Sequence, residues 1–328
     1  MKMTVLIPTY RRPQDLERCL TALQQQIRPA DEVLITVRDI DAETWTFLAT
    51  FDSHALPLKV LTINVPGVVA AINLGFESAS GDIISVTDDD AAPHPDWLQR
   101  IEAHFLADES LGGLGGRDWT YVNSQLQAAT MHPGASNLVG RVLWFGRTIG
   151  NHHIGAGEPR EVDILKGVNM SFRKVALAKL RCDERMKGTG AQVNFEIALS
   201  LSVKRNGWKL IYDSAVAVDH YPAQRFDEDQ RDTFNAIAWT NRSHNETVGL
   251  LDHLPMPQKI VYSIWALLIG TREVFGFVQL CRFLPTEKGL AAQKWWASVQ
   301  GRWQGLQTWS RTLPKKPPSA GKQEVVAQ

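Results

Sequence analysis

The sequence predicts an α/β protein, with a mostly parallel sheet flanked by helices and a helical C-terminal extension. Over the first hundred residues, short apolar runs alternate with amphipathic stretches, which is the pattern of parallel βαβ units. From about residue 223 the pattern becomes mostly helical. The length of 328 residues accommodates one large domain or two modest ones.

Local patterns support each element at the start of the chain. Val5–Ile7 is a short apolar run that predicts a strand. Pro13 occupies a tolerated first-turn position and opens a helix whose Leu16, Leu20 and Leu23 share one face. The same alternation predicts the following elements: strands at residues 32–37, 58–63 and 82–87, and a helix at 68–79.

A glycine-rich stretch, Leu111–Trp119, reads LGGLGGRDW. It matches neither the GxGxxG nor the Walker pattern, so we interpret it as a strand whose glycines allow close approach of another backbone. The region at 121–160 is rich in loops, and we interpret His152 and His153 there as part of a substrate loop. The remaining predicted elements are a helix at 97–106, a strand leading into a helix at 162–172, a helix at 193–205, and strands near 209–212 and 216–219.

Composition excludes several classes of protein. Lys plus Arg equals Asp plus Glu at 35 each, and the absence of a basic excess argues against a nucleic-acid partner. The three cysteines, Cys19, Cys182 and Cys281, form no CxxC pair, which argues against structural zinc and favours a reducing compartment. The chain shows neither a signal-peptide pattern nor an apolar run of about 20 residues. We therefore expect a cytoplasmic location.

The C-terminal region is basic and rich in tryptophan. Residues 272–328 carry nine basic and three acidic side chains, with Trp265, Trp295, Trp296, Trp303 and Trp309 in or beside them. This pattern predicts an extension, residues 223–313, that contacts an anionic membrane surface. The alternative is an ordinary amphipathic helix packed on the core. Residues 314–328 are predicted to be disordered, which leaves residues 1–222 as the first domain.

Three consecutive carboxylates, Asp88, Asp89 and Asp90, directly follow a predicted buried strand. They repel one another unless a cation or solvent compensates, and hard oxygen ligands suit Mg²⁺ or Mn²⁺. Ligands of open α/β sheets bind beyond the carboxyl ends of the strands, where this triplet lies. The alternative is a solvated acidic turn, with Asp96 as the N-cap of the next helix.

An ordered set of motifs carries a family resemblance. Residues 5–12 read VLIPTYRR, residues 73–90 read NLGFESASGDIISVTDDD, and residues 166–173 read KGVNMSFR. Over roughly residues 3–220 the chain resembles a family 2 glycosyltransferase with the GT-A fold. The resemblance implies transfer of a sugar from a nucleotide-sugar donor with inversion at the anomeric carbon, and family frequency favours a UDP-sugar.

The resemblance also implies roles for individual residues. Asp90 would bind a divalent metal, Mg²⁺ or Mn²⁺, and His220 would complete the metal shell, although His220 could instead be a strand-end histidine bonded to backbone. Asp41 rivals Asp39 because the family's D-x-S-x-D pattern is blurred here to RDIDAET. The residues implied to contact the nucleotide or the donor sugar are Pro8, Thr9, Arg11, Asp39, Asn73, Asp88, Asp89, Lys166 and Asn169.

The resemblance implies that Glu196 is the catalytic base. In the family a glycine-rich turn leads to an acidic pair whose second member is the base, and here that pair reads Phe195-Glu196 within GTGAQVNFEIAL. A glutamate has an ordinary pKa of about 4.3 and is ionised near neutrality. The alternative is a helix N-terminal glutamate favoured by the helix dipole. Asp183 and Glu184 are the fallback bases.

The resulting hypothesis is a metal-dependent inverting glycosyltransferase that acts on a lipid-linked or oligosaccharide acceptor at the cytoplasmic membrane face, in surface polysaccharide or glycolipid synthesis. The first alternative is a catalytically silent nucleotide-sugar-binding or scaffolding subunit, because Phe195 replaces the first acid and Ala70-Ala71 stand where the family often has a basic residue. A nucleotidyltransferase would need a glycine-rich basic loop, which IPTYRRP lacks. A lipid-binding structural protein would not need the Asp triplet.

Overall fold

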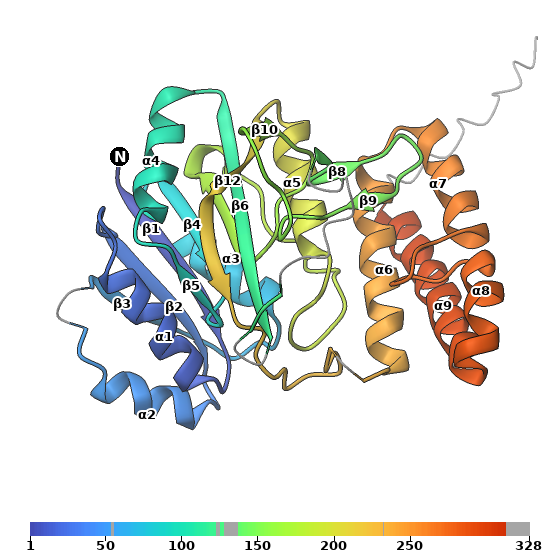
Figure 1. Ribbon diagram of the computed structural model, residues 1–328, viewed down its shortest axis with the longest axis horizontal. Helices are drawn as coiled ribbons and strands as arrows, with labels where there is room; N and C mark the ends of the chain where they lie inside the picture. Colours follow the sequence, from blue (N-terminus) through green and yellow to red (C-terminus); the bar gives the residue numbers. More distant parts are fainter. Residues whose placement is uncertain (54–55, 123–124, 128–136, 232, 313–328) are drawn as a thin grey trace, which may run out of the picture.

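The computed structural model describes residues 1–53, 56–122, 125–127, 137–231 and 233–312. A central sheet lies between helices, and a group of C-terminal helices packs beside it (Figure 1). The predicted disordered tail, residues 314–328, lies outside the described residues.

The sheet follows the order β10-β12-β6-β11-β4-β1-β2-β3. One half of the sheet consists of four parallel strands that come before the Asp triplet in the sequence. They are β1 (Met3–Thr9), β2 (Glu32–Arg38), β3 (Leu58–Ile63) and β4 (Ile83–Thr87). Antiparallel β11 joins this half to β6, and β6 is parallel to β12. The strands of the second half are β6 (Leu111–Val122), β10 (Arg160–Glu161), β11 (Asn169–Arg173) and β12 (Lys209–His220). The mostly parallel sheet is therefore confirmed.

Four short strands lie off this path. β5 (Ala91–Pro93) pairs with β12, and β7 (Gln125–Leu126) pairs with β6. β8 (Arg141–Val142) and β9 (Thr148–Ile149) form a separate hairpin.

Helices cover both faces of the sheet, because alternate side chains of its strands point to opposite sides. Within β1, Val5 and Ile7 belong to one apolar cluster, which they share with α1 and α4, whereas Leu6 belongs to the cluster packed on α3 and α5. The helices of this part are α1 (Pro13–Gln24), α2 (Ala42–Thr50), α3 (Val68–Ser78), α4 (Trp97–Ala107) and α5 (Phe195–Arg205).

Most predicted elements are confirmed, and a few differ. Helix α2 was not predicted because it has almost no buried face, with only Thr44 buried. The predicted strand and helix at 162–172 are the shorter β11 and a single 3-10 turn, Lys174–Leu177. The two strands predicted near residues 209–219 are one strand, β12, with an irregular register between Asp213 and Ala217.

The glycine-rich stretch is a strand, as predicted. It forms most of β6 and pairs with both β11 and β12. A Cβ atom added at Gly116 would lie 1.7 Å from the backbone oxygen of Val216, so no larger residue fits while β12 keeps its place. Close backbone approach, rather than phosphate binding, explains this glycine.

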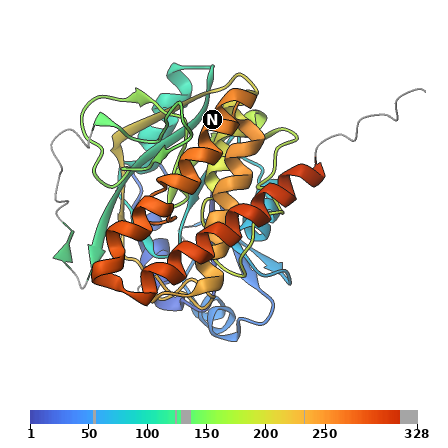
Figure 2. The same cartoon turned by 90° about the vertical axis from the view of Figure 1, so that its right-hand side faces the viewer.

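The helical extension consists of α6 (Ala236–His253), α7 (Met256–Leu268), α8 (Phe277–Glu287) and α9 (Gly289–Thr312). Figure 2 looks onto these helices, coloured orange to red. Ile197 of α5 packs with Leu250 and Leu251 of α6, which attaches the extension to the sheet domain. Among the residues that the structure describes, none of the helices has the length and apolar character needed to cross a membrane.

Candidate functional site

The Asp triplet divides between the pocket and the protein interior. It follows β4, and Asp88 and Asp90 line a pocket at the carboxyl ends of the parallel strands. Asp89 points away and is fully buried, where its carboxylate accepts a hydrogen bond from Thr9 Oγ1 at 2.7 Å and pairs with Arg12 Nη2 at 3.0 Å. Burial raises the pKa of Asp89 to about 7. Two carboxylates of the triplet are thus available to a ligand.

Asp90 is surrounded by donors from distant parts of the chain. Its carboxylate lies 3.3 Å from Arg12 Nη1, 3.4 Å from Arg231 Nη2 and 3.4 Å from His220 Nε2. It also accepts a hydrogen bond from the backbone N–H of Ala223 at 2.9 Å. Burial opposes ionisation, but His220 and Arg12 together hold the pKa of Asp90 well below its usual range. Asp90 is therefore an anion at neutral pH.

His220 ends β12 between two buried carboxylates. Its Nε2 faces Asp90, and its Nδ1 lies 3.7 Å from the carboxylate of Asp118, which also pairs with Lys166. Burial alone would lower the pKa of His220, but Asp118 and Asp90 raise it to about 9. Without a metal ion, the histidine is a cation that balances the surrounding carboxylates.

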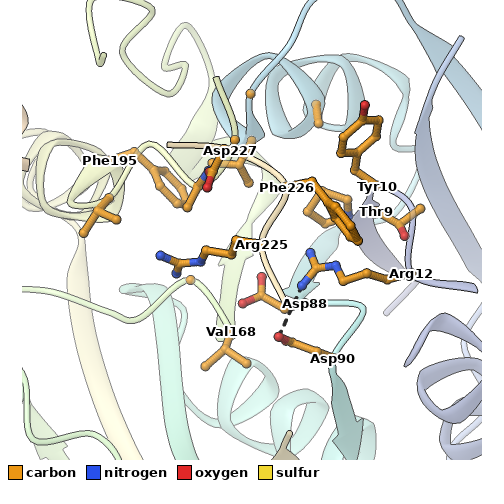
Figure 3. A pocket seen from close by; sticks show the side chains of 18 of the residues that line it. Thr9, Tyr10, Arg12, Asp88, Asp90, Val168, Phe195, Arg225, Phe226 and Asp227 are labelled. Atoms are coloured by element: carbon orange, nitrogen blue, oxygen red, sulfur yellow. Dashed lines mark hydrogen bonds and ion pairs between the residues drawn. The ribbon is translucent and has the colours of Figure 1, made fainter. Parts of the chain in front are cut away.

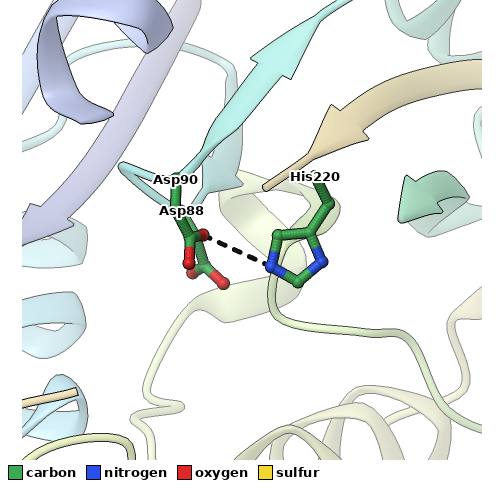
Figure 4. A group of neighbouring side chains, drawn as sticks. All are labelled: Asp88, Asp90 and His220. Atoms are coloured by element: carbon green, nitrogen blue, oxygen red, sulfur yellow. Dashed lines mark ion pairs between the residues drawn. The ribbon is translucent and has the colours of Figure 1, made fainter. Parts of the chain in front are cut away.

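Asp88, Asp90 and His220 could together hold a metal ion (Figure 4). One ligand atom from each lies within 4.8 Å of the others. Asp90 Oδ1 and both ring nitrogens of His220 are buried without a hydrogen-bond partner in the described structure. Burial, followed by the charge of Asp90, raises the pKa of Asp88. Carboxylates suit Mg²⁺ and Mn²⁺, and imidazole must lose its proton to join them.

Further parts of the pocket lining come from α5 and from the segment after β12 (Figure 3). Phe195 and Glu196 reach it from the first turn of α5. Arg225 and Phe226 come from residues 221–231, which cross the pocket as an irregular segment. The Phe226 ring meets Tyr10 edge-on, with the centroids 6.3 Å apart. The pocket thus joins anionic, cationic and aromatic groups.

Glu196, the predicted base, lines the pocket. Burial raises its pKa, while the charge of Lys166 opposes the shift, and a raised carboxyl pKa brings the group closer to the operating pH. The fallback candidates Asp183 and Glu184 line a separate hollow, where Asp183 pairs with Arg185 at 2.6 Å. The geometry therefore favours Glu196 over these two.

The pocket brings together many of the residues predicted for the site. Those that line it are Pro8, Thr9, Asp88, Asp90, Lys166, Glu196 and His220. The others, Arg11, Asp39, Asn73, Asp89 and Asn169, are not among its lining residues.

The residues outside the pocket have other contacts. Asp39 is exposed, and its carboxylate accepts from the N–H of Ile40 at 3.0 Å. Asn73 is buried, and its side chain bonds both the N–H and the C=O of Cys182, at 2.8 and 3.0 Å. The guanidinium of Arg11 lies 5.1 Å from the Phe226 ring centroid.

Asn169 and Asp41 connect structural elements. Asn169 is buried, accepts from Trp97 Nε1 at 2.9 Å and donates to the C=O of Val216 at 2.9 Å. It therefore joins α4, β11 and β12 beneath the triplet. Asp41, the rival of Asp39, caps α2 by accepting from the N–H of Thr44 and also accepts from the N–H of Arg11 at 2.6 Å. Because these contacts occupy the polar side-chain atoms of Asn169 and Asp41, those atoms are not free to bind a nucleotide.

Several charged residues of the site were not predicted. Arg12 stood beside Arg11 in the motif VLIPTYRR, and Asp118 ended the glycine-rich stretch, so both had a sequence signal. Arg225 and Arg231 had none, because the irregular segment that carries them has no periodic pattern. The predicted substrate-loop role of His152 finds no support, since His152 is buried, interacts with the C=O of Ile164 at 3.2 Å and packs on Tyr212.

A mostly parallel sheet with a carboxylate-lined pocket at its carboxyl edge is typical of α/β proteins that bind ligands there. The chain belongs to glycosyl transferase family 2, whose family model matches residues 4–180. A 128-residue segment is 29% identical to glycosyltransferase AglE of Haloferax volcanii and covers 37% of this chain and 41% of that protein. The chain matches less than half the length of the curated relatives that it resembles.

Solved structures show the same fold. TarS from S. aureus in complex with UDP-GlcNAc has a TM-score of 0.59 at 15% identity, over 94% of this chain and 89% of that one. The mannosyltransferase PcManGT from Pyrobaculum calidifontis, in complex with GDP-Man and Mn²⁺, has a TM-score of 0.56 at 17% identity, over 94% and 84%. The predicted GT-A fold is confirmed.

Proposed function

We propose that the protein is an inverting, metal-dependent glycosyltransferase that uses a nucleotide-sugar donor, with a UDP-sugar as the first choice. One observation carries the proposal: Glu196 lines the same pocket as the cluster of Asp88, Asp90 and His220. The complexes of TarS with UDP-GlcNAc and of PcManGT with GDP-Man and Mn²⁺ support this choice of donor and metal.

Asp88, Asp90 and His220 would hold Mn²⁺ or Mg²⁺. When bound, such an ion neutralises the charge of a diphosphate leaving group and orients its oxygens. Arg12 and Arg231 both contact Oδ2 of Asp90, so the carboxylate is already positioned before the ion and the donor arrive. Lys166 compensates Asp118 beneath His220.

Glu196 would remove the proton from the acceptor hydroxyl. As that oxygen forms its bond to the anomeric carbon, the bond to the diphosphate oxygen breaks, and its electron pair leaves with the diphosphate. Attack from the face opposite the leaving group inverts the anomeric configuration, so the base must stand across the pocket from the Asp cluster. Glu196, on α5, lines the same pocket as Asp88 and Asp90, which follow β4, and would act from the side opposite the diphosphate.

The nucleobase would bind beside β2. Thr36 Oγ1 is buried without a hydrogen-bond partner in the described residues, and Arg38 Nε lies 3.7 Å from the carboxylate of Asp39. Both Thr36 and Arg38 line the pocket. Arg38 also lies 5.9 Å from the ring centroid of Tyr10. These groups offer hydrogen bonds to base carbonyl oxygens and a ring face for stacking.

The proposed acceptor is a lipid-linked or oligosaccharide substrate at the cytoplasmic membrane face, in surface polysaccharide or glycolipid synthesis. The basic, Trp-rich extension supports this choice. The competing function is a catalytically silent nucleotide-sugar-binding or scaffolding subunit, which Phe195 in the first acid position favours.

Turnover of a donor panel separates these functions. Sugar nucleotides of UDP, GDP, CDP and dTDP are incubated with the protein and Mn²⁺, and release of the nucleoside diphosphate is followed, with water as the default acceptor. We expect slow release from one nucleotide class and a sugar product of inverted configuration by NMR. Binding of a donor without any turnover, in the presence of membrane extracts as acceptor source, would favour the silent subunit.

A further inference from the structure

The outer side of the helical extension exposes large apolar side chains. We call this surface the apolar face. Its members each expose between 45% and 62% of their surface: Met256, Ile260, Ile264, Leu267 and Leu268 of α7, Phe277, Val278 and Leu284 of α8, and Trp296 and Trp303 of α9. Monomeric proteins rarely expose large contiguous apolar surface without a partner.

Helical spacing places these side chains in stripes. Met256, Ile260 and Ile264 recur every four residues, so they lie on one side of α7. Helix α8 has no buried residue at all, although it packs along α9. Both helices therefore present an apolar side outward, in the layer that faces the viewer in Figure 2.

Helices α7 and α8 and the residues beside them carry cations without carboxylate partners. Within the described part of the chain, no ion pair is formed by Lys259, Arg272, Arg282 or Lys288. Residues 256–288 contain two carboxylates, and both are already paired: Glu273 with Arg242 at 3.2 Å, and Glu287 with Lys294 at 2.7 Å. The surface thus combines apolar side chains with uncompensated positive charge.

Aromatic rings accompany these cations. Lys259 Nζ lies 4.8 Å from the ring centroid of Trp309, and the Arg282 guanidinium lies 5.4 Å from that of Phe283. Apolar side chains flanked by Trp, Lys and Arg are the composition of interfacial membrane helices. The structure assigns the apolar face to the surface of a bilayer that contains anionic lipid, with α7 and α8 lying in the interface.

A second copy of the chain fits this surface less well. Symmetric pairing through the apolar face would bring the same four cations of each copy together, and like charges facing each other oppose association. Anionic headgroups would instead neutralise them. The inference goes beyond the proposed transfer reaction, and only its link to a lipid-linked acceptor rests on the proposed function.

Vesicle sedimentation tests the inference on the full chain. Vesicles of phosphatidylcholine alone are compared with vesicles that also contain phosphatidylglycerol. We expect binding to the anionic vesicles, reduced at least about tenfold by the double variant Ile260→Glu and Ile264→Glu. The double variant Arg272→Gln and Arg282→Gln should lose about fivefold for each charge removed. The matched control is Leu106→Glu, at a residue that is 62% exposed on α4.

The controls keep the test independent of catalysis. No donor or metal ion is present, so failure of sugar transfer leaves this result intact, and thermal unfolding verifies that each variant is folded. The inference would be overturned by absent vesicle binding, or by equal losses in the α7 variant and the Leu106 control. Sedimentation velocity adds a third contrary outcome: a dimer that the α7 variant converts to monomer, without vesicle binding, would assign the face to self-association.

Discussion

The carboxyl edge of the sheet buries charge, whereas the outer side of the helical extension exposes apolar surface. Asp89, Asp90 and Asp118 are at most 1% exposed, while Ile260 and Ile264 are more than half exposed. Each arrangement is unfavourable by itself. Both regions therefore depart from ordinary packing at the places where we propose an external partner. The partner is a metal-bound nucleotide in the first region and a lipid surface in the second.

Between these two regions the packing is ordinary and close. Helix α9 approaches α6 closely at Gly301. A Cβ atom at this position would lie 2.3 Å from the backbone oxygen of Thr240, so a larger residue would push the helices apart. The contact between α6 and α9, which we call the seam, is therefore closely packed at Gly301 and leaves no surface free for a partner there. Changes in the pocket, in the seam and on the apolar face should consequently have different effects.

The largest expected effect is on sugar transfer. The substitution Glu196→Gln keeps the shape of the side chain but removes the base, so turnover should fall by about 10²–10⁴-fold, while nucleotide affinity stays the same. Asp183→Asn is the control, since Asp183 lies in the separate hollow. Steady-state turnover and calorimetric titration measure the two quantities. A greater loss of turnover in Asp183→Asn would transfer the role of base to that residue.

Next in size is the effect on stability at the seam. Gly301→Ala should lower the free energy of unfolding by about 1–3 kcal/mol, because the new methyl group displaces the backbone of α6. Gly289→Ala, in the same helix, is the control, since nothing lies within 4 Å of its added Cβ. Denaturant titrations compare the two variants. Equal stability would show that α9 shifts freely and that the extension packs loosely on α6.

The pH dependence of metal binding should be smaller. His220 has a pKa of about 9 in the metal-free protein, and its proton must leave before the imidazole can bind a metal. The Mn²⁺ affinity should therefore rise up to about tenfold per pH unit between pH 7 and 9. His220→Gln should abolish this dependence. Calorimetry in buffers of different ionisation enthalpy counts the released proton, and binding without proton release would remove His220 from the metal shell.

The raised pKa of His220 also predicts that the folding stability of the metal-free protein falls with pH, whereas metal affinity rises. Because the pKa of His220 is raised above its ordinary value of 6.5, the charged histidine stabilises the metal-free fold fully below pH 6.5. This contribution should be lost as the pH rises through about 9. Denaturant titrations of wild type and His220→Gln along this range measure it.

The smallest expected effect is a difference in nucleotide affinity between variants of two neighbouring residues, Arg38 at the end of β2 and Asp39 in the following turn. Arg38 lines the pocket, whereas Asp39 is exposed outside it. Arg38→Gln should weaken nucleotide binding by about tenfold, the lower end of the range for one hydrogen bond to a charged group. Asp39→Asn should leave the affinity within about twofold. The reverse order would restore Asp39 as the nucleotide contact implied by the family resemblance.

The sequence predicts the sheet domain well because its signals are local and ordered. Apolar runs such as Val5–Ile7 become buried strands, and the Asp triplet follows β4 at the carboxyl edge as expected. The pocket-facing roles within the triplet were not predictable, because the turn after β4 directs Asp89 inward to Thr9 and Arg12. A motif specifies residue types, and only the fold determines which polar atoms remain free.

The sequence predicts the packing of the helical extension less well than that of the sheet domain. The extension's basic, Trp-rich composition predicted contact with a membrane surface, but the exposed apolar side chains of α7, such as Ile260 and Ile264, were not identified. Trp295 and Trp309 are half-buried, whereas Trp296 and Trp303 are exposed. Composition cannot separate them, because which side of a helix faces outward depends on how α6 and α9 pack.

The central claim is that Asp88, Asp90 and His220 form a metal-dependent nucleotide site. Calorimetric titration of UDP, GDP, CDP and dTDP with and without Mn²⁺ tests it most directly, on wild type, on Asp90→Asn, and on Glu109→Gln as an exposed control with the same change in charge. We predict that one nucleotide binds wild type and the control only with Mn²⁺, and that Asp90→Asn lowers its affinity at least about tenfold. Nucleotide binding that needs no metal, or that Asp90→Asn leaves unchanged, would contradict the account.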